Sequence, residues 1–491
     1  MGGEPISTAV LLTAFGVLLA FSVGLSRASA RLGLPIVLLF LVVGVMAGSE
    51  GVGGIAFDDY RFAYRVGTVA LVFILFDGGL NTSFQAARQV LAPAVLLATV
   101  GVLFIAALVG AAAHLLGLSW PLSMLLGAIV SSTDAAAVFA MLNASGTRLR
   151  KRVGLTLEVE SGLNDPMAVI LTSVLTAALV GTRTSVITIG GHVLVQMVVG
   201  AVVGFVVARA GRWLILRIRL PAAGLYPAFT LAIACLSYGV ATLLDGSGFL
   251  SVYITGMTLG SGALPHAVGV RRVHVALGWL SQVVMFLLLG LLVSPSRLVH
   301  VAPIGLALAL FLAFIARPAV VMLGLKPFKY PWRESAFVGW TGLRGAVPIV
   351  LATIPVMAGA PAARELFDVV FFIVVVGAFV PGATVTHLAR MFGVESSAPP
   401  PPSALVEVDA LAPQGDELRA YFVSSDLAVC GATLAEVPFP SGAAVSMLER
   451  GGALIAPSGS TRLEEGDYVY VIAPAEDRPH VELLFGLPEE H

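Results

Sequence analysis

Long apolar runs dominate this sequence and restrict the folds open to it. About thirteen of them are long enough to cross a bilayer, and 58% of the 491 residues are hydrophobic while only 12% are charged. That composition excludes an ordinary soluble protein and predicts an all-α polytopic membrane protein. The runs lie at residues 7–26, 33–50, 62–80, 91–115, 119–142, 155–180, 186–208, 225–244, 248–262, 275–293, 302–325, 334–358 and 366–389.

The short loops between these runs alternate in charge. Every second loop is rich in Lys or Arg, as at residues 148–152 and 271–272, whereas intervening loops such as residues 51–60 are poor in them. Basic loops remain on the cytoplasmic side of a membrane. With an odd number of helices, we expect a multi-pass protein of the cell (inner) membrane, with its N-terminus outside and its C-terminus in the cytoplasm.

The run at residues 155–180 is unusual because it contains acids. If its helix begins near residue 155, a rise of about 1.5 Å per residue puts Asp165 roughly 15 Å deep, near the bilayer midplane. An Asp there costs about 2.5–3.5 kcal/mol on insertion, so Asp165 should face protein or a water-filled cavity. The polar residues of this stretch are Glu158, Glu160, Ser161, Asn164 and Asp165.

Helical spacing divides these residues between two faces. Glu158, Ser161 and Asp165 fall on one face, and Glu160 and Asn164 share another. One helix therefore offers two separate polar roles. Glu158 has two interpretations: it caps the helix end near the basic loop, which we favour, or it admits protons to Asp165.

Three other runs carry polar features at membrane depth. Residues 131–134, Ser-Ser-Thr-Asp, interrupt the fifth run, and a break there exposes helix ends that can coordinate a cation. Asp77 places an acid in the third run. Arg344, in a run interrupted by Gly and Pro, stands out as the clear cation of the membrane region. A guanidinium in the membrane needs an anion, and we expect Glu160 to supply it.

Together these residues suit a protein in which a monovalent cation and a proton compete for the same oxygens. Either one neutralises Asp165, and if only the neutral site can move, exchange is obligatory and alternating access follows. A channel is the first alternative, but no TVGYG-type filter is present. A primary pump would need a GxxxxGK[ST] motif, which is also absent. A membrane sensor with the tail as its output is a further alternative.

The composition changes after Arg390. Four consecutive prolines at residues 399–402 indicate an extended linker, and strand-like runs follow at residues 419–423, 453–456 and 468–473. We therefore expect a transmembrane exchanger domain at 1–392, a Pro-rich linker at 393–416 and a small α/β cytoplasmic domain at 417–491. No basic patch for nucleic acid is present.

Four motifs resemble the signatures of NhaP-type monovalent cation:proton antiporters. They are Leu-Phe-Asp-Gly-Gly-Leu at 75–80, Thr133-Asp134, Glu160-Ser161 with Asn164-Asp165, and Gly-Leu-Arg-Gly at 342–345. The resemblance implies an electroneutral secondary antiporter, not an enzyme, with neither catalytic residues nor a cofactor. It also implies inverted repeats, crossing discontinuous helices and a homodimer.

The resemblance assigns a role to each matching position. Asp165 binds K+ or Na+ transiently and carries the proton, with Ser161, Asp134, the backbone of Thr133 and Asp77 as further ligands. Glu160, Asn164 and Arg344 form a structural lock. Asp77 stands where relatives often have Glu, which is a departure from the family pattern.

The tail resembles a TrkA-C (RCK-C) regulatory domain. The matching segments include Gly-Ala-Thr-Leu-Ala-Glu at 431–436 and Leu-Glu-Glu-Gly-Asp-Tyr at 463–468. Such tails imply K+/H+ exchange of the cell-volume-regulation kind, and a nucleotide ligand such as a cyclic dinucleotide. Na+/H+ exchange remains the alternative, because oxygen ligands bind both ions.

Overall fold

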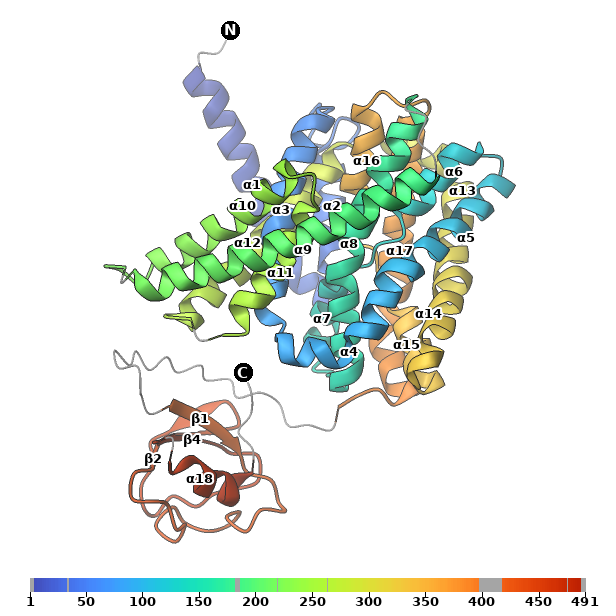
Figure 1. Cartoon of the computed structure of the whole chain (residues 1–491). Coiled ribbons are helices and arrows are strands. Elements are labelled where there is room, and N and C mark those ends of the chain that lie inside the picture. Colours follow the sequence, from blue (N-terminus) through green and yellow to red (C-terminus); the bar gives the residue numbers. More distant parts are fainter. Residues whose placement is uncertain are drawn as a thin grey trace. The chain divides into compact units, whose positions relative to one another are not determined.

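The computed structural model describes residues 4–32, 35–181, 186–218, 220–262, 264–396, 417–474 and 476–486 (Figure 1). The chain divides into two compact units, Met1–Ser396 and Ser397–His491. Residues 397–416, which make up most of the expected Pro-rich linker, lie outside the described part. The domain limits expected from the sequence therefore stay a prediction.

The first unit is helical. Nine helices in the described ranges are long and apolar enough to span a membrane. Together with α2, α11 and two interrupted segments, they correspond to the thirteen predicted runs, so the polytopic helical fold is confirmed. The helices are α1 (Glu4–Leu32), α2 (Ile36–Ala47), α3 (Tyr60–Asn81), α4 (Phe84–Leu96), α5 (Val102–Leu115), α6 (Trp120–Ile129), α7 (Ala135–Ala144), α8 (Lys151–Leu179), α9 (Val186–Arg217), α10 (Leu225–Leu243), α11 (Gly248–Gly260), α12 (Ala267–Leu291), α13 (Pro295–Phe311), α14 (Arg317–Leu325), α15 (Trp332–Trp340), α16 (Val347–Met357) and α17 (Ala363–Phe392).

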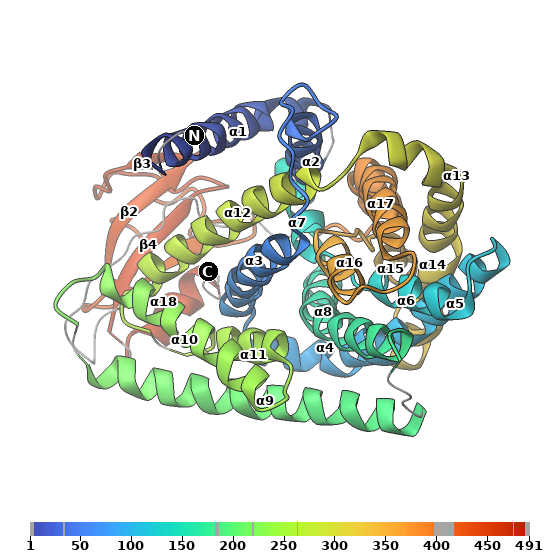
Figure 2. The same cartoon turned by 90° about the horizontal axis from the view of Figure 1, so that it is seen from above.

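The helices form two bundles. One contains α1–α3 and α9–α12, with α9 lying along α10 and α11 (Figure 2). The other contains α4–α8 and α13–α17. Small residues allow close packing: a Cβ on Gly256 of α11 would lie 2.6 Å from the carbonyl oxygen of Phe76 on α3. Such backbone contact is how membrane helices associate without a hydrophobic driving force between them.

The two interrupted segments meet at their breaks. Residues 130–134 separate α6 from α7, and residues 341–346 separate α15 from α16. The amide of Asp134 donates a hydrogen bond to the carbonyl oxygen of Leu343 at 2.8 Å, and Arg344 Nε donates to the carbonyl oxygen of Val130 at 3.2 Å. The predicted pair of discontinuous helices is therefore present, and each break satisfies backbone groups of the other.

The second unit contains a four-stranded antiparallel sheet in the order β1-β4-β2-β3. The three strand-like runs correspond to β1 (Glu417–Phe422), β3 (Ala453–Ile455) and β4 (Tyr468–Ala473). The sequence did not predict β2 (Ala444–Arg450) or α18 (Arg478–Phe485). β2 lacks clear alternation because a register shift between Val445 and Met447 interrupts its pairing with β4.

An ion pair with a buried carboxylate and a half-buried guanidinium connects β2 to the turn before β4. Asp467 is fully buried, and its two carboxylate oxygens each accept a hydrogen bond at 2.8 Å from Arg450. These bonds to Asp467 raise the pKa of the Arg450 guanidinium. Asp467 also accepts the backbone N–H of Glu464 at 2.7 Å.

We expect Asp467→Ala to destabilise the sheet of the tail by about 2–3 kcal/mol, because it removes the carboxylate that organises this turn. Hydrogen exchange in the full-length protein should then be more than about tenfold faster for β4 amides. Asp426→Ala, at an exposed turn position, is the matched control and should leave exchange unchanged. Equal protection of the β4 amides in both variants would contradict the role given to Asp467 in this turn.

Candidate ion-binding site

A cavity of about 160 Å³ lies where α8 passes the two breaks. Side chains from both bundles line it, including residues from α3, α8, α11 and α12. The structure therefore brings together several of the polar residues singled out in the sequence. The polar groups in its lining are Asp134, Glu158, Ser161, Asp165, Tyr253 and Gln282.

Asp165 is the buried carboxylate of this cavity. It is 8% exposed, and its Oδ1 atom has no hydrogen-bond partner among the described residues. The hydroxyls of Ser132 and Tyr253 are likewise buried without a partner in the described ranges. An unpaired buried polar atom is costly, so such a cluster needs a functional reason. A cation or a proton at Asp165 would supply the missing interaction.

Ser161 fixes the break between α6 and α7. Its hydroxyl donates to the carbonyl oxygen of Thr133 at 2.8 Å and accepts the N–H of Ala135 at 3.1 Å. Asp134 caps α7, because its Oδ1 accepts the N–H of Ala137 at 3.1 Å. The break thus presents a carbonyl, a hydroxyl and a carboxylate beside Asp165. All three are oxygen groups of the type that hard monovalent cations bind.

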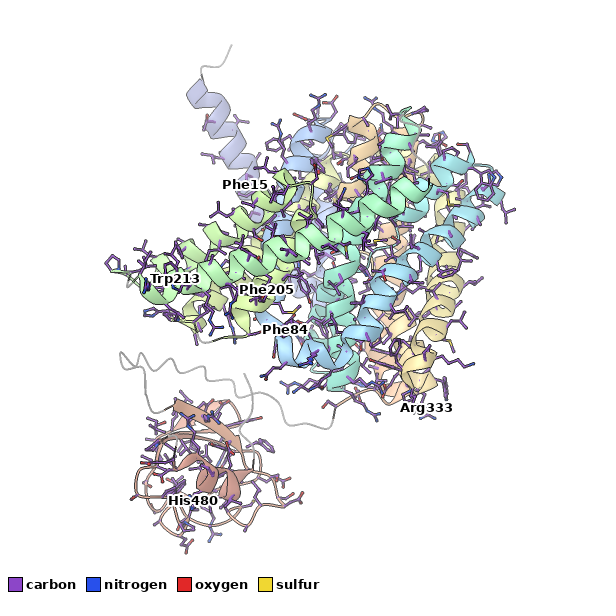
Figure 3. All side chains as sticks on the ribbon, viewed as in Figure 1. Phe15, Phe84, Phe205, Trp213, Arg333 and His480 are labelled. Carbon is purple, nitrogen blue, oxygen red and sulfur yellow. The ribbon has the colours of Figure 1, made fainter. Side chains whose placement is uncertain are left out.

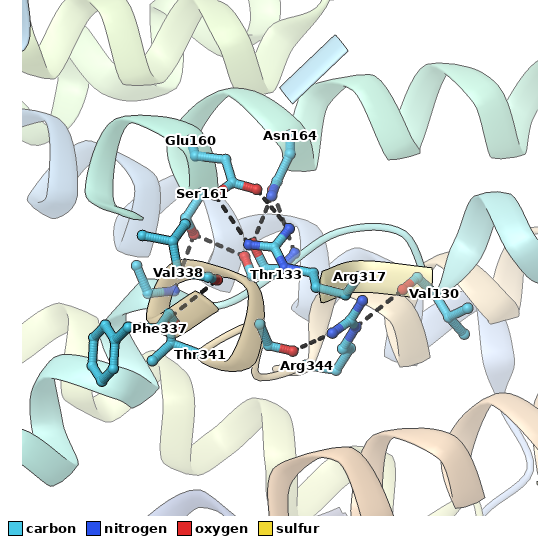
Figure 4. A network of polar contacts seen from close by, with 12 residues as sticks. Val130, Thr133, Glu160, Ser161, Asn164, Arg317, Phe337, Val338, Thr341 and Arg344 are labelled. Carbon is cyan, nitrogen blue, oxygen red and sulfur yellow. Dashed lines mark hydrogen bonds and ion pairs between the residues drawn. The ribbon is translucent and has the colours of Figure 1, made fainter. Parts of the chain in front are cut away.

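The second polar face of α8 holds a different set of contacts (Figure 4). Asn164 Nδ2 donates to Thr133 Oγ1 at 2.7 Å, and Asn164 Oδ1 accepts the N–H of Thr133 at 3.4 Å. Glu160 is 1% exposed and accepts two bonds from Arg317, at 2.6 Å and 3.0 Å. This bidentate pair joins α8 to α14 in the interior.

The expected ion pair between Glu160 and Arg344 is wrong. Arg317 occupies that position, and Arg344 instead donates to the carbonyl oxygens of Val130 and Gly342 (Figure 4). Val130 directly follows the last residue of α6, where free carbonyls and the negative end of the helix dipole attract a cation. Arg344 therefore bridges the two breaks through the backbone.

Arg317 is a residue that the sequence analysis missed. It lies within the apolar run at 302–325, so the sequence already contained a second cation in the membrane region. Arg344 is therefore not the only cation there. It is 2% exposed. The rule that a charge in a membrane helix needs a partner applied to Arg317 as directly as to Arg344.

Two further expectations differ from the structure. Glu158 does not cap α8, because that helix begins two turns earlier at Lys151; Glu158 lines the cavity and accepts a hydrogen bond from the Thr82 hydroxyl. Asp77 does not line the cavity. Its Oδ1 accepts a hydrogen bond from Asn81 at 3.1 Å, and its Oδ2 lies beside Gly278 of α12.

Comparisons with known proteins agree with this arrangement. The family described as "Sodium/hydrogen exchanger, transmembrane" matches residues 17–391, and the TrkA-C domain matches residues 418–486. The K(+)/H(+) antiporter NhaP of Alkalimonas amylolytica is 44% identical over 415 residues, covering 83% of this chain and 71% of that protein. The K(+)/H(+) antiporter NhaP2 of Shewanella oneidensis is 41% identical over 497 residues, covering 100% of this chain and 85% of that protein.

A solved structure shares the fold. The sodium proton antiporter MjNhaP1 from Methanocaldococcus jannaschii superposes with a TM-score of 0.69 at 24% identity, covering 78% of this chain and 99% of that one. The family match and these relatives together define a multi-pass membrane cation/proton antiporter, a transporter rather than an enzyme. The chain belongs to the sodium/hydrogen exchanger family and carries a C-terminal TrkA-C domain.

Proposed function

We propose that this protein exchanges K+ for H+ electroneutrally by alternating access, with the two ions competing for Asp165. The observation that carries the proposal is the buried Oδ1 atom of Asp165, which has no hydrogen-bond partner among the described residues and lies in a cavity at the meeting point of two broken helices. A single carboxylate that takes either one K+ or one H+ gives one-for-one exchange. Relatives 44% and 41% identical to this chain are named K(+)/H(+) antiporters, which supports K+ as the cation.

The neighbouring groups have distinct proposed roles. Ser161, Asp134 and the Thr133 carbonyl supply further oxygen ligands to the cation. Glu158, which lines the same cavity, passes protons to Asp165. Asp77 is not included in this site, because it lies outside the cavity lining.

The second face of α8 serves as a structural lock. Glu160 with Arg317, and Asn164 with Thr133, hold the first break against α8. Arg344 joins the two breaks. We place the side chains of these residues outside the transported ion's ligands, because Glu160, Asn164, Arg317 and Arg344 do not line the cavity that contains Asp165.

The setting of this activity also belongs to the proposal. The protein works as a homodimer in the cell membrane, with its N-terminus outside and its tail in the cytoplasm, where the TrkA-C domain takes a regulatory nucleotide. The alternation of basic loops supports the orientation.

Na+/H+ exchange is the second candidate. The family description names sodium, and the Na(+)/H(+) antiporter ApNhaP of Aphanothece halophytica is 28% identical over 423 residues. Both cations are bound by oxygen ligands, so a direct comparison of the two ions decides between them.

Dissipation of a preformed pH gradient in everted vesicles, on addition of KCl or NaCl, tests this function. Wild type should respond to KCl, whereas Asp165→Asn should give no response above that of vesicles lacking the protein. Asp58→Asn, in an exposed loop, is the matched control and should behave as wild type. An imposed membrane potential should leave the rate unchanged.

Other outcomes point elsewhere. A response to NaCl alone would replace K+ by Na+. Conduction far above turnover-limited rates would indicate a channel. A normal response of Asp165→Asn, at equal protein levels, would remove Asp165 from the transport step.

A further inference from the structure

An apolar groove runs along the outer face of the second bundle, away from the ion site. It has a volume of about 490 Å³ and lies between α14, α15 and α17. Phe314 and Met322 are 52% and 43% exposed, so the groove opens on the surface that faces lipid. Six of its lining residues are Phe314, Met322, Ala336, Trp340, Leu388 and Phe392.

The groove has the length and chemistry of an acyl-chain site. Phe314 and Trp340 stack edge to face at a centroid distance of 5.1 Å at its inner end. Trp340 donates its indole N–H to Thr384 at 2.9 Å, so its polar atom is satisfied within the protein. From Phe314 to Met322, the two ends of the lining on this segment, the chain rises about 12 Å at 1.5 Å per residue, most of the roughly 15 Å thickness of one hydrocarbon leaflet.

Basic residues gather where the groove reaches the end of the helices. Phe392 in the groove contacts Trp332 at a centroid distance of 6.0 Å, and the Arg333 guanidinium lies 5.7 Å from the Trp332 ring. Arg333 lies at this end of the bundle (Figure 3). Lys326 and Lys329 lie in the turn that leads from α14 to α15, and both are exposed.

These three cations have no carboxylate partner among the described residues. The acids nearby are already paired: Glu334 lies 3.6 Å from Arg150, and Glu395 lies 3.3 Å from Arg390. An apolar groove that ends at uncompensated positive charge fits an amphiphile with an apolar tail and an anionic head. An extended peptide does not fit this surface, because its unpaired backbone polar groups would face hydrocarbon.

We propose that this groove binds one anionic phospholipid of the membrane. An acyl chain lies between α14, α15 and α17, and the phosphate head group contacts Lys326, Lys329 and Arg333. The lipid then bridges three helices of the bundle that carries Asp165. Each cation near an anionic head group raises the affinity for the lipid about fivefold. Three cations together therefore favour an anionic lipid over the neutral lipids of the surrounding membrane.

Native mass spectrometry of the full-length protein in detergent tests this site by titration with phosphatidylglycerol and with phosphatidylcholine of the same acyl chains. Wild type should retain one phosphatidylglycerol per chain at concentrations about a hundredfold below those needed for phosphatidylcholine. The triple variant Lys326→Gln, Lys329→Gln, Arg333→Gln should lose this preference. Ala336→Trp, which fills the groove, should weaken binding of both lipids.

Two matched controls separate this site from general lipid contact. Arg88→Gln, Arg217→Gln, Arg272→Gln removes three exposed arginines elsewhere, and Leu323→Trp adds an indole to α14 at a 71% exposed position outside the groove. Both should bind lipid as wild type does, and glycerol phosphate should not compete. Equal affinity for the two lipids, or unchanged phosphatidylglycerol binding in either test variant, would overturn the proposal.

Discussion

Replacing Arg317 by Ala lowers the free energy of unfolding by about 3–5 kcal/mol, because Glu160 is left charged and unpaired in the interior. The pair is nearly inaccessible, with the two side chains 2% and 1% exposed. Glu160→Ala should lower the free energy of unfolding by at least as much. It removes the one carboxylate that contacts Arg317 among the described residues. Two guanidinium groups then remain close together without it, because the Arg317 and Arg344 side chains both lie against Gly342.

Thermal unfolding of the purified protein in detergent measures this effect. The double variant Glu160→Ala, Arg317→Ala should be less destabilised than the sum of the single variants, because no lone charge remains. Arg390→Ala, which breaks the exposed pair with Glu395, is the control and should cost less than about 1 kcal/mol. Additive single effects would mean that the pair is not coupled.

Gly345→Ala should reduce cation-dependent proton movement by about ten- to a hundredfold while the protein still folds. A Cβ at Gly345 would collide with the carboxylate of Asp134. The carboxylate can swing away, but the Asp134 Cβ, 2.9 Å from the added atom, moves only with the backbone, so a small shift of the break adds to the cost of about 1 kcal/mol for the lost cap on α7. The movement displaces an oxygen from the cavity that contains Asp165.

The vesicle assay with added KCl, at matched expression, measures this reduction. Gly377→Ala is the matched control, because a Cβ at that position of α17 meets no atom within 4 Å. It should transport as wild type does. A Gly345→Ala variant with a wild-type rate would mean that the position of Asp134 does not matter for exchange.

Local patterns were sufficient to predict much of the fold and part of the candidate site. Hydropathy and charge alternation predicted the helical runs, because insertion into a membrane depends on each segment separately. The helical period placed Glu158, Ser161 and Asp165 on one face of α8, and the structure has all three in the cavity lining. The polar break at residues 131–134 was visible because it interrupts an apolar run.

What the sequence did not reveal depends on contacts between distant segments. The Glu160–Arg317 pair joins residues 157 positions apart, and no local spacing selects Arg317 over Arg344. Asp77 lies beside Gly278 rather than in the cavity because of how α3 packs on α12. The strand β2 escaped prediction because its register shift disturbs the alternation on which strand prediction depends.

The bond between the two breaks carries a consequence for how this chain can diverge. The hydrogen bond from Asp134 to Leu343 joins main-chain atoms, and Arg344 also uses a main-chain acceptor at Val130. A side-chain substitution at Leu343 or Val130 leaves these acceptors in place. Loss or gain of a single residue within 341–346 would shift both the Leu343 carbonyl and the Arg344 guanidinium relative to the first break. The length of this segment is therefore under stronger constraint than the identity of several of its residues.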